Sequence, residues 1–239
     1  MSQRRAWILA AISLALVLYG LAMSYQSRSA RFAKPGEVLY PQIVELETPR
    51  YAADAADLLR ADAIAVKPAL HWEQIDQYRI STEWDDGLLV LYPLQLIAVC
   101  GLAWTSRSRG YAVAAGVLIV LGAFCDWREN RHIFDILGQA VPLQTTVDTL
   151  RHWSLAKWGL DGAAWLCAAV ALHRSIFSAA GIKHIQPWRV RFVTVAFFIS
   201  GVLSLCGAAS FVPAWDYRAL LAEGVFFNAL AVIGCVFRP

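Results

Sequence analysis

Apolar runs of about 20 residues recur along the chain and constrain its fold more than any other feature. A helix of that length crosses the hydrocarbon core of a bilayer, which is about 30 Å thick. Backbone polar groups cannot remain unpaired in lipid, and none of the runs alternates as a barrel strand would. The sequence therefore predicts an all-α, polytopic transmembrane helical bundle of about six spans, at residues 6–23, 87–104, 111–130, 157–172, 192–212 and 219–237.

The composition agrees with a lipid-exposed surface. Hydrophobic residues make up 58% of the chain and charged residues only 16%, whereas soluble domains carry about 25% charged residues. This excludes a disordered chain and most soluble folds, so the lipid bilayer is the first expected partner. A formal net charge of +3 gives no indication of nucleic-acid binding.

The distribution of charge predicts the orientation in the membrane. If the N-terminus is cytoplasmic, the inner segments are residues 1–5, 105–110, 173–191 and the last residues of the chain. These segments hold nine of the 21 Lys and Arg residues and none of the 18 Asp and Glu residues. Because basic residues concentrate in cytoplasmic loops, both termini are expected on the cytoplasmic side.

Three units follow from these spans. Residues 1–23 form an N-terminal transmembrane anchor, residues 24–86 a periplasmic loop or cap, and residues 87–239 a five-helix transmembrane bundle. Arg4 and Arg5 before an apolar run also fit a cleavable signal peptide. The run is about 17 residues long against the usual 7 to 15 or so of a signal peptide, which favours an uncleaved anchor.

The cap has few large apolar side chains, so it cannot form much of a core alone and is expected to fold against the helices. Thr48 is a candidate N-cap, with Pro49 at the first helical position. Apolar residues follow at helical spacing from Tyr51. The sequence therefore predicts one short amphipathic helix in this segment.

The third span ends in a set of polar residues that share one helix face. Asp126, Glu129 and Asn130 are spaced by three and four residues, and the fourth span opens with Lys157 and Asp161, four residues apart. Charge at this depth is costly in lipid, so these side chains are expected to face protein.

Further polar residues lie at the same predicted level. Asp85 and Asp86 open the second span, and Glu223 lies near the start of the sixth. One shared network near the outer ends of the spans is therefore the simplest interpretation. Acidic residues outnumber basic ones at this level. This predicts a bound divalent cation, a bound amine-bearing headgroup, or a proton retained by Glu223 or Asp126. His71, His132 and His152 lack the spacing of zinc ligands, so no histidine metal site is expected.

The order of these motifs resembles a group of uncharacterised bacterial multipass membrane proteins. Their pattern is an outer E-L-A-like segment, a span opening with Asp, a span ending in D-x-x-E-N and a span opening near Lys. The match covers about residues 42–160. It rests on Gln42-Ile-Val-Glu45-Leu-Glu47, the 52–59 segment, Trp84-Asp85-Asp86-Gly-Leu-Leu-Val-Leu-Tyr92, the 122–130 segment and Lys157-Trp158.

This chain departs from that pattern at Glu47, where a small residue is expected, and spans five and six are additional. The resemblance implies a bacterial inner membrane and no particular activity. It also implies that a single site comprises Glu45, Asp85 or Asp86, Asp126, Glu129, Asn130 and Lys157.

Two interpretations of the network remain open at this point. A structural network would pair Asp126 or Glu129 with Lys157 and fix the helix register. A functional network would bind or organise a lipid headgroup or a protein partner. Alternatively, it would belong to an integral-membrane enzyme acting on a lipid-linked substrate, with Asp126 or Glu129 as the acid or base, or to a small transporter. No motif assigns a cofactor or a catalytic nucleophile.

The orientation is testable with topology reporters. Reporters fused after Arg109, after Lys183 and at the C-terminus are expected to read cytoplasmic, because the inner segments carry no acidic residues. Reporters near Arg60 and Val147 are expected to read periplasmic. A cytoplasmic reading near Arg60 would overturn the orientation.

Overall fold

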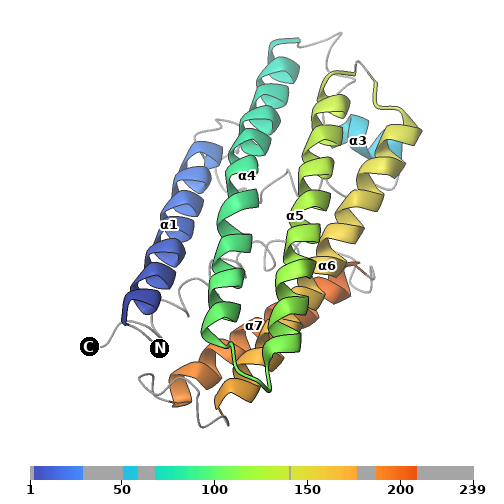
Figure 1. Ribbon diagram of the computed structural model, residues 1–239. Coiled ribbons are helices and arrows are strands. Elements are labelled where there is room, and N and C mark those ends of the chain that lie inside the picture. The colour runs from blue at the N-terminus through green and yellow to red at the C-terminus, as the bar shows by residue number, and fades with distance from the viewer. Residues whose placement is uncertain (1–2, 29–50, 59–67, 140, 177–186, 209–239) are drawn as a thin grey trace.

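The computed structural model describes residues 3–28, 51–58, 68–139, 141–176 and 187–208 (Figure 1). Over these ranges every regular element is a helix and no strand is present, which confirms the all-α prediction for this part. The helices are α1 (Gln3–Arg28), α3 (Ala52–Leu58), α4 (Pro68–Leu102), α5 (Arg109–Leu137), α6 (Gln144–Ile176) and α7 (Pro187–Ala208).

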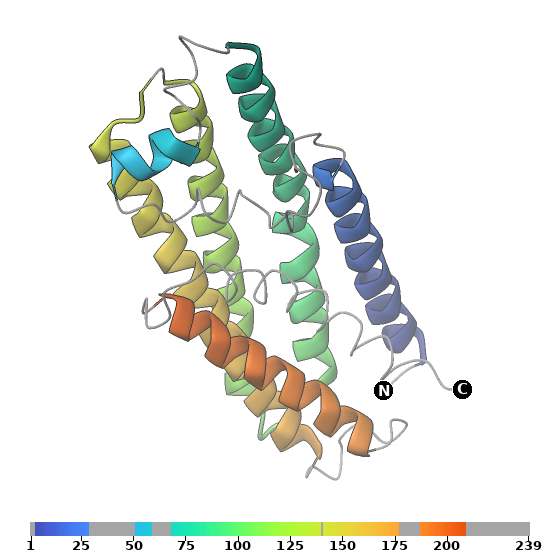
Figure 2. The same cartoon turned by 180° about the vertical axis from the view of Figure 1, so that it is seen from behind.

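The long helices pack in chain order, so that α1 lies on α4, α4 on α5, α5 on α6 and α6 on α7. Figure 2 shows α7 crossing the lower half of α6, and α3 lying across the opposite end of the bundle. At the α6–α7 crossing, a side chain at Gly162 or Gly201 would meet the backbone carbonyl of the other glycine. Glycine therefore allows the two backbones to approach closely.

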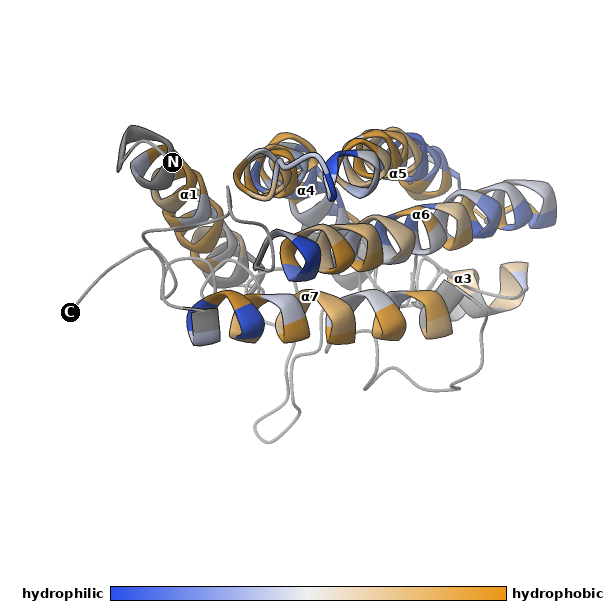
Figure 3. Cartoon of the chain, turned by 60° about the horizontal axis from the view of Figure 1, so that its bottom comes forward, coloured by the Kyte–Doolittle hydropathy of each residue, from blue (hydrophilic) through white to orange (hydrophobic). Residues whose placement is uncertain are grey.

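Four of these helices are long and apolar enough to cross a membrane, which is the property expected of a membrane protein. The stretches are Tyr78–Leu102, Arg109–Leu137, Gln144–Ser175 and Trp188–Cys206. Helix α1 contains a shorter apolar stretch, Trp7–Met23. Apolar residues cover the outward sides of α4 and α5 (Figure 3). The predicted sixth span lies outside the described residues, so the number six stays a prediction.

Two helices begin well before the spans predicted for them. Helix α4 starts at Pro68 and not near residue 87, so the predicted boundary between cap and bundle falls inside it. Helix α6 starts at Gln144, about three and a half turns before Lys157. Hydropathy detects only the part of a helix that faces lipid, whereas packing against neighbouring helices extends the helix into the polar region.

Two hydrophobic clusters lie at different levels of the bundle. The larger cluster lies toward the α4–α5 connection and draws on α1, α4, α5, α6 and α7. The smaller one lies at the other end, where α3 meets the extended ends of α4, α5 and α6. Its buried members are Ala55, Ile75, Tyr78, Ile133, Ile136, Leu137, Val147 and Leu150. The extended helix ends are therefore held together by a core of their own.

The short helix predicted in the cap corresponds to α3. It begins at Ala52, where the backbone N–H donates to the side-chain oxygen of Gln144 on α6 at 2.8 Å. Ala55 is fully buried in the smaller cluster. The predicted N-cap residues Thr48 and Pro49 lie outside the described residues.

Candidate functional site

One face of α5 carries the polar residues that the sequence singles out. Asp126, Glu129 and Asn130 are buried together with Ile119 and Ile133 on the same side of the helix. This is the stripe predicted by helical spacing. Ile119 belongs to the larger hydrophobic cluster and Ile133 to the smaller one, so the polar residues lie between two apolar regions.

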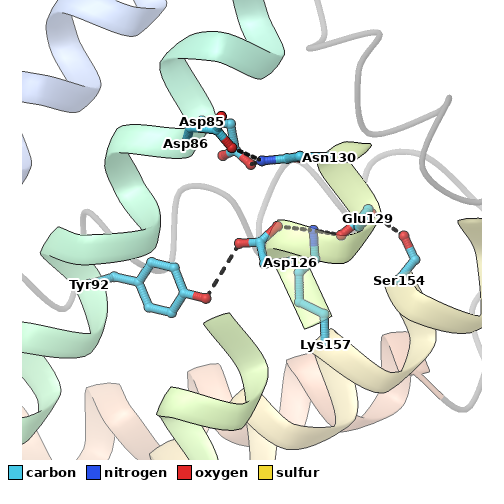
Figure 4. Close-up of polar contacts among 8 residues, drawn as sticks. All are labelled: Asp85, Asp86, Tyr92, Asp126, Glu129, Asn130, Ser154 and Lys157. Atoms are coloured by element: carbon cyan, nitrogen blue, oxygen red, sulfur yellow. Dashed lines mark hydrogen bonds and ion pairs between the residues drawn. The ribbon is translucent and has the colours of Figure 1, made fainter. Parts of the chain in front are cut away.

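The polar layer, as we define it, spans three helices. Helix α4 contributes Asp85 and Asp86, α5 contributes Asp126, Glu129 and Asn130, and α6 contributes Ser154, Lys157 and Asp161. Figure 4 shows most of these side chains turned toward one another between the helices. The layer divides into a buried inner part around Lys157 and a partly exposed outer part around Asn130.

Lys157 is the centre of the inner part. Its Nζ lies 2.5 Å from Glu129 Oε2 and 3.2 Å from Asp126 Oδ1. The three side chains are only 6%, 0% and 8% exposed, so the ion pairs are shielded from solvent. The ammonium also lies 4.8 Å from the centre of the Trp158 ring. The pairing of Lys157 with these acids, predicted from the sequence, is therefore present.

Two hydroxyl groups complete the bonding of these carboxylates. Ser154 Oγ donates to Glu129 Oε1, and Tyr92 Oη donates to Asp126 Oδ2 at 3.4 Å (Figure 4). Buried carboxylates need such donors because a buried charge is stable only when it is paired and hydrogen-bonded. Neither Ser154 nor Tyr92 is among the nine predicted site residues, although Tyr92 ends the motif that begins at Trp84. Spacing offers a signal for both, since Ser154 lies three residues before Lys157 and Tyr92 seven residues after Asp85.

Asp161 lies one helical turn beyond Lys157 and is 5% exposed. Its Oδ1 has no hydrogen-bond partner among the described residues. This oxygen lies against Gly122 of α5, where any larger residue would overlap the carboxylate. Glycine at 122 therefore makes room for an acid between α5 and α6.

The outer part joins α4 to α5. Asn130 Nδ2 lies 3.1 Å from Asp85 Oδ2 and 3.1 Å from Asp86 Oδ1, so one amide donates to both carboxylates (Figure 4). Arg131 Nη2 lies 3.3 Å from Asp86 Oδ2, with side chains that are 49% and 32% exposed. Asp86 is thus held at the surface of the bundle and can still be reached from outside.

Seven of the nine predicted site residues lie in this layer. They are Asp85, Asp86, Asp126, Glu129, Asn130, Lys157 and Asp161. Glu45 and Glu223 lie outside the described residues, so their membership stays a prediction. Lys157 and Asp161 were expected at the start of a span, but the early start of α6 places them in the helix interior.

The inner part contains more acidic than basic side chains. Asp126, Glu129 and Asp161 are buried together with one lysine, Lys157. Removing one partner of a buried lysine–carboxylate pair leaves an uncompensated charge in a region of low polarity. The described residues contain no group of three or more His, Cys, Asp or Glu arranged to hold a metal ion. Buried carboxylates around a lysine can join helices, and the partly exposed carboxylate of Asp86 can accept hydrogen bonds from a cation.

Comparison with known proteins gives no match, whether with family models, with curated proteins or with solved structures. The resemblance to bacterial multipass proteins consequently stays a prediction. Any function for this chain has to be argued from its own residues.

Removing the central cation tests whether the inner part stabilises the fold. Lys157→Met is expected to lower the free energy of unfolding by about 3 to 5 kcal/mol, because Glu129 and Asp126 would remain buried without their partner. Arg151→Met, which removes a partly exposed charge from the same helix, is the matched control. Unfolding in one detergent measures both variants, and equal stability of Lys157→Met and the parent would contradict the assignment.

Proposed function

We propose that this protein is a multipass protein of the bacterial inner membrane that binds the amine group of a phospholipid headgroup at Asp85 and Asp86. The site lies on the periplasmic side if both termini are cytoplasmic. In this proposal the inner part of the polar layer, around Lys157, holds α5 and α6 in place, while the outer part binds the ligand. A basic side chain of a membrane-protein partner would have the same chemistry.

The observation that carries the proposal is the shared amide of Asn130. By donating to both Asp85 and Asp86 at 3.1 Å, this amide orients two carboxylates on neighbouring residues toward one place. A primary ammonium offers several N–H donors to such a pair of acceptors. Asp86 is 32% exposed, so an ammonium can approach it without unfolding the bundle.

The geometry gives less support to the enzymatic alternative. A reaction at Asp126 or Glu129 needs access for a substrate, yet these side chains are 8% and 0% exposed. Lys157 occupies the space between them, and hydrophobic clusters lie on both sides of the layer. The same burial favours a structural role for this inner part, with ligand binding at the outer aspartates.

The proposal predicts a preference for headgroups with a primary amine. We expect phosphatidylethanolamine to bind the purified protein more tightly than phosphatidylcholine, whose methylated amine cannot donate hydrogen bonds. Asp86→Asn and Asp85→Asn are expected to weaken phosphatidylethanolamine binding about tenfold, as loss of one charge-assisted hydrogen bond predicts. Native mass spectrometry of the detergent-solubilised full chain measures the retained lipid.

The matched control is Asp76→Asn, which removes an exposed carboxylate from the same helix. This variant is expected to bind phosphatidylethanolamine like the parent. Equal binding of the two lipids, or an equal loss in all three variants, would rule out the proposed site.

A further inference from the structure

The outward face of α5 changes from apolar to cationic within about one turn. Over most of its length this face exposes aliphatic and aromatic side chains, with exposures of about one half for Val113, Val117, Val120, Leu121 and Phe124. Trp127 follows, and then Arg128 and Arg131. Such a face fits the hydrocarbon of a bilayer up to Phe124 and the headgroup region beyond it.

The two arginines at this boundary share one aromatic ring. The Arg128 guanidinium lies 6.0 Å from the centre of the Trp127 ring, and that of Arg131 lies 5.7 Å from it. Arg128 also lies 5.3 Å from the Trp153 ring of α6. Phe124 contacts both indoles, at 5.8 Å from Trp127 and 6.1 Å from Trp153. Aromatic rings therefore fix the position of the Arg128 guanidinium.

The charges of the two arginines are compensated differently. Arg131 pairs with Asp86, as described above. Within the described part of the chain, Arg128 contacts the two indole rings and no carboxylate. Its N–H donors match the planar, paired acceptors of a phosphate. Arg131 lies three residues further along the helix and over the same Trp127 ring, so its guanidinium is a second donor near the same position.

We propose that Arg128, together with Arg131, binds the phosphate of a phospholipid whose acyl chains lie on the exposed apolar face of α5. From Val117 to Arg128 the helix rises about 16 Å, and one leaflet of hydrocarbon is about 15 Å thick. A lipid with its phosphate at Arg128 therefore covers the face from Val117 to Phe124 with its chains. Trp127 and Trp153 lie at the level of the glycerol backbone, where indoles are favoured.

This inference does not rest on the amine site. The ligand is recognised by its phosphate, and the donors are guanidinium groups on the lipid-facing side of α5. The aspartates of the outer part bind an ammonium and lie toward α4. An anionic phospholipid without an amine, such as phosphatidylglycerol, is therefore the appropriate probe.

The test measures phosphatidylglycerol retained by the detergent-solubilised full chain in native mass spectrometry. Arg128→Gln is expected to bind phosphatidylglycerol about fivefold more weakly, which corresponds to about 1 kcal/mol for one basic side chain near anionic lipid. Arg109→Gln, which changes an exposed arginine at the opposite end of the same helix, is expected to bind like the parent. Arg128→Lys, which retains the charge without the planar donors, is expected to fall between them.

Three outcomes would overturn the inference. The first is that Arg128→Gln binds phosphatidylglycerol like the parent. The second is that Arg109→Gln loses as much phosphatidylglycerol binding as Arg128→Gln. The third is that inorganic phosphate competes as effectively as phosphatidylglycerol, which would indicate an anion site that does not recognise lipid. Asp85→Asn separates this inference from the proposed function, because Asp85 accepts from Asn130 and is not the ion-pair partner of Arg131. This variant is expected to lose phosphatidylethanolamine and to retain phosphatidylglycerol. If that variant loses its preference for phosphatidylethanolamine while Arg128→Gln binds phosphatidylglycerol like the parent, the phosphate site is refuted and the amine site is supported.

Discussion

The ion pairs of Lys157 with Glu129 and Asp126 are the interaction on which the described structure depends. These charges lie between two hydrophobic clusters and are almost completely shielded from solvent. Bringing a lysine and two carboxylates out of water costs several kcal/mol per ion, and only close pairing with further hydrogen bonds offsets it. Ser154 and Tyr92 supply those hydrogen bonds. The register of α5 against α6 is therefore fixed by polar contacts, because any axial shift would separate the charges.

A short segment of α5 connects this interaction to the surface. Asp126 and Glu129 face Lys157 on α6, Asn130 and Arg131 reach the aspartates of α4, and Arg128 contacts Trp153 on the lipid-facing side. Because successive residues of a helix point in different directions, one buried network positions two separate candidate sites on the surface. Both candidate sites lie at the level where the apolar part of α5 ends, which is the level of lipid headgroups.

Those parts of the structure that follow from helical spacing and from the cost of buried charge could be predicted from the sequence. The shared face of Asp126, Glu129 and Asn130 and the pairing with Lys157 follow from these two constraints. Hydropathy could not locate the starts of α4 and α6, because the extended helix ends are stabilised by packing in the smaller cluster. The hydroxyl partners also depend on tertiary contacts, since a Tyr or a Ser on a helix gives no sign of which carboxylate it meets.

A double-mutant cycle between Lys157 and Glu129 tests the central claim most directly. Unfolding free energies of Lys157→Met, Glu129→Gln and the double variant, measured in the same detergent, give the energy that couples the two side chains. Groups in direct contact couple by about 0.5 to 3 kcal/mol, and this buried pair is expected in the upper part of that range. The double variant should then be clearly more stable than the sum of the single effects predicts. Additivity within about 0.5 kcal/mol would contradict the account, because it would mean that the two charges do not depend on each other.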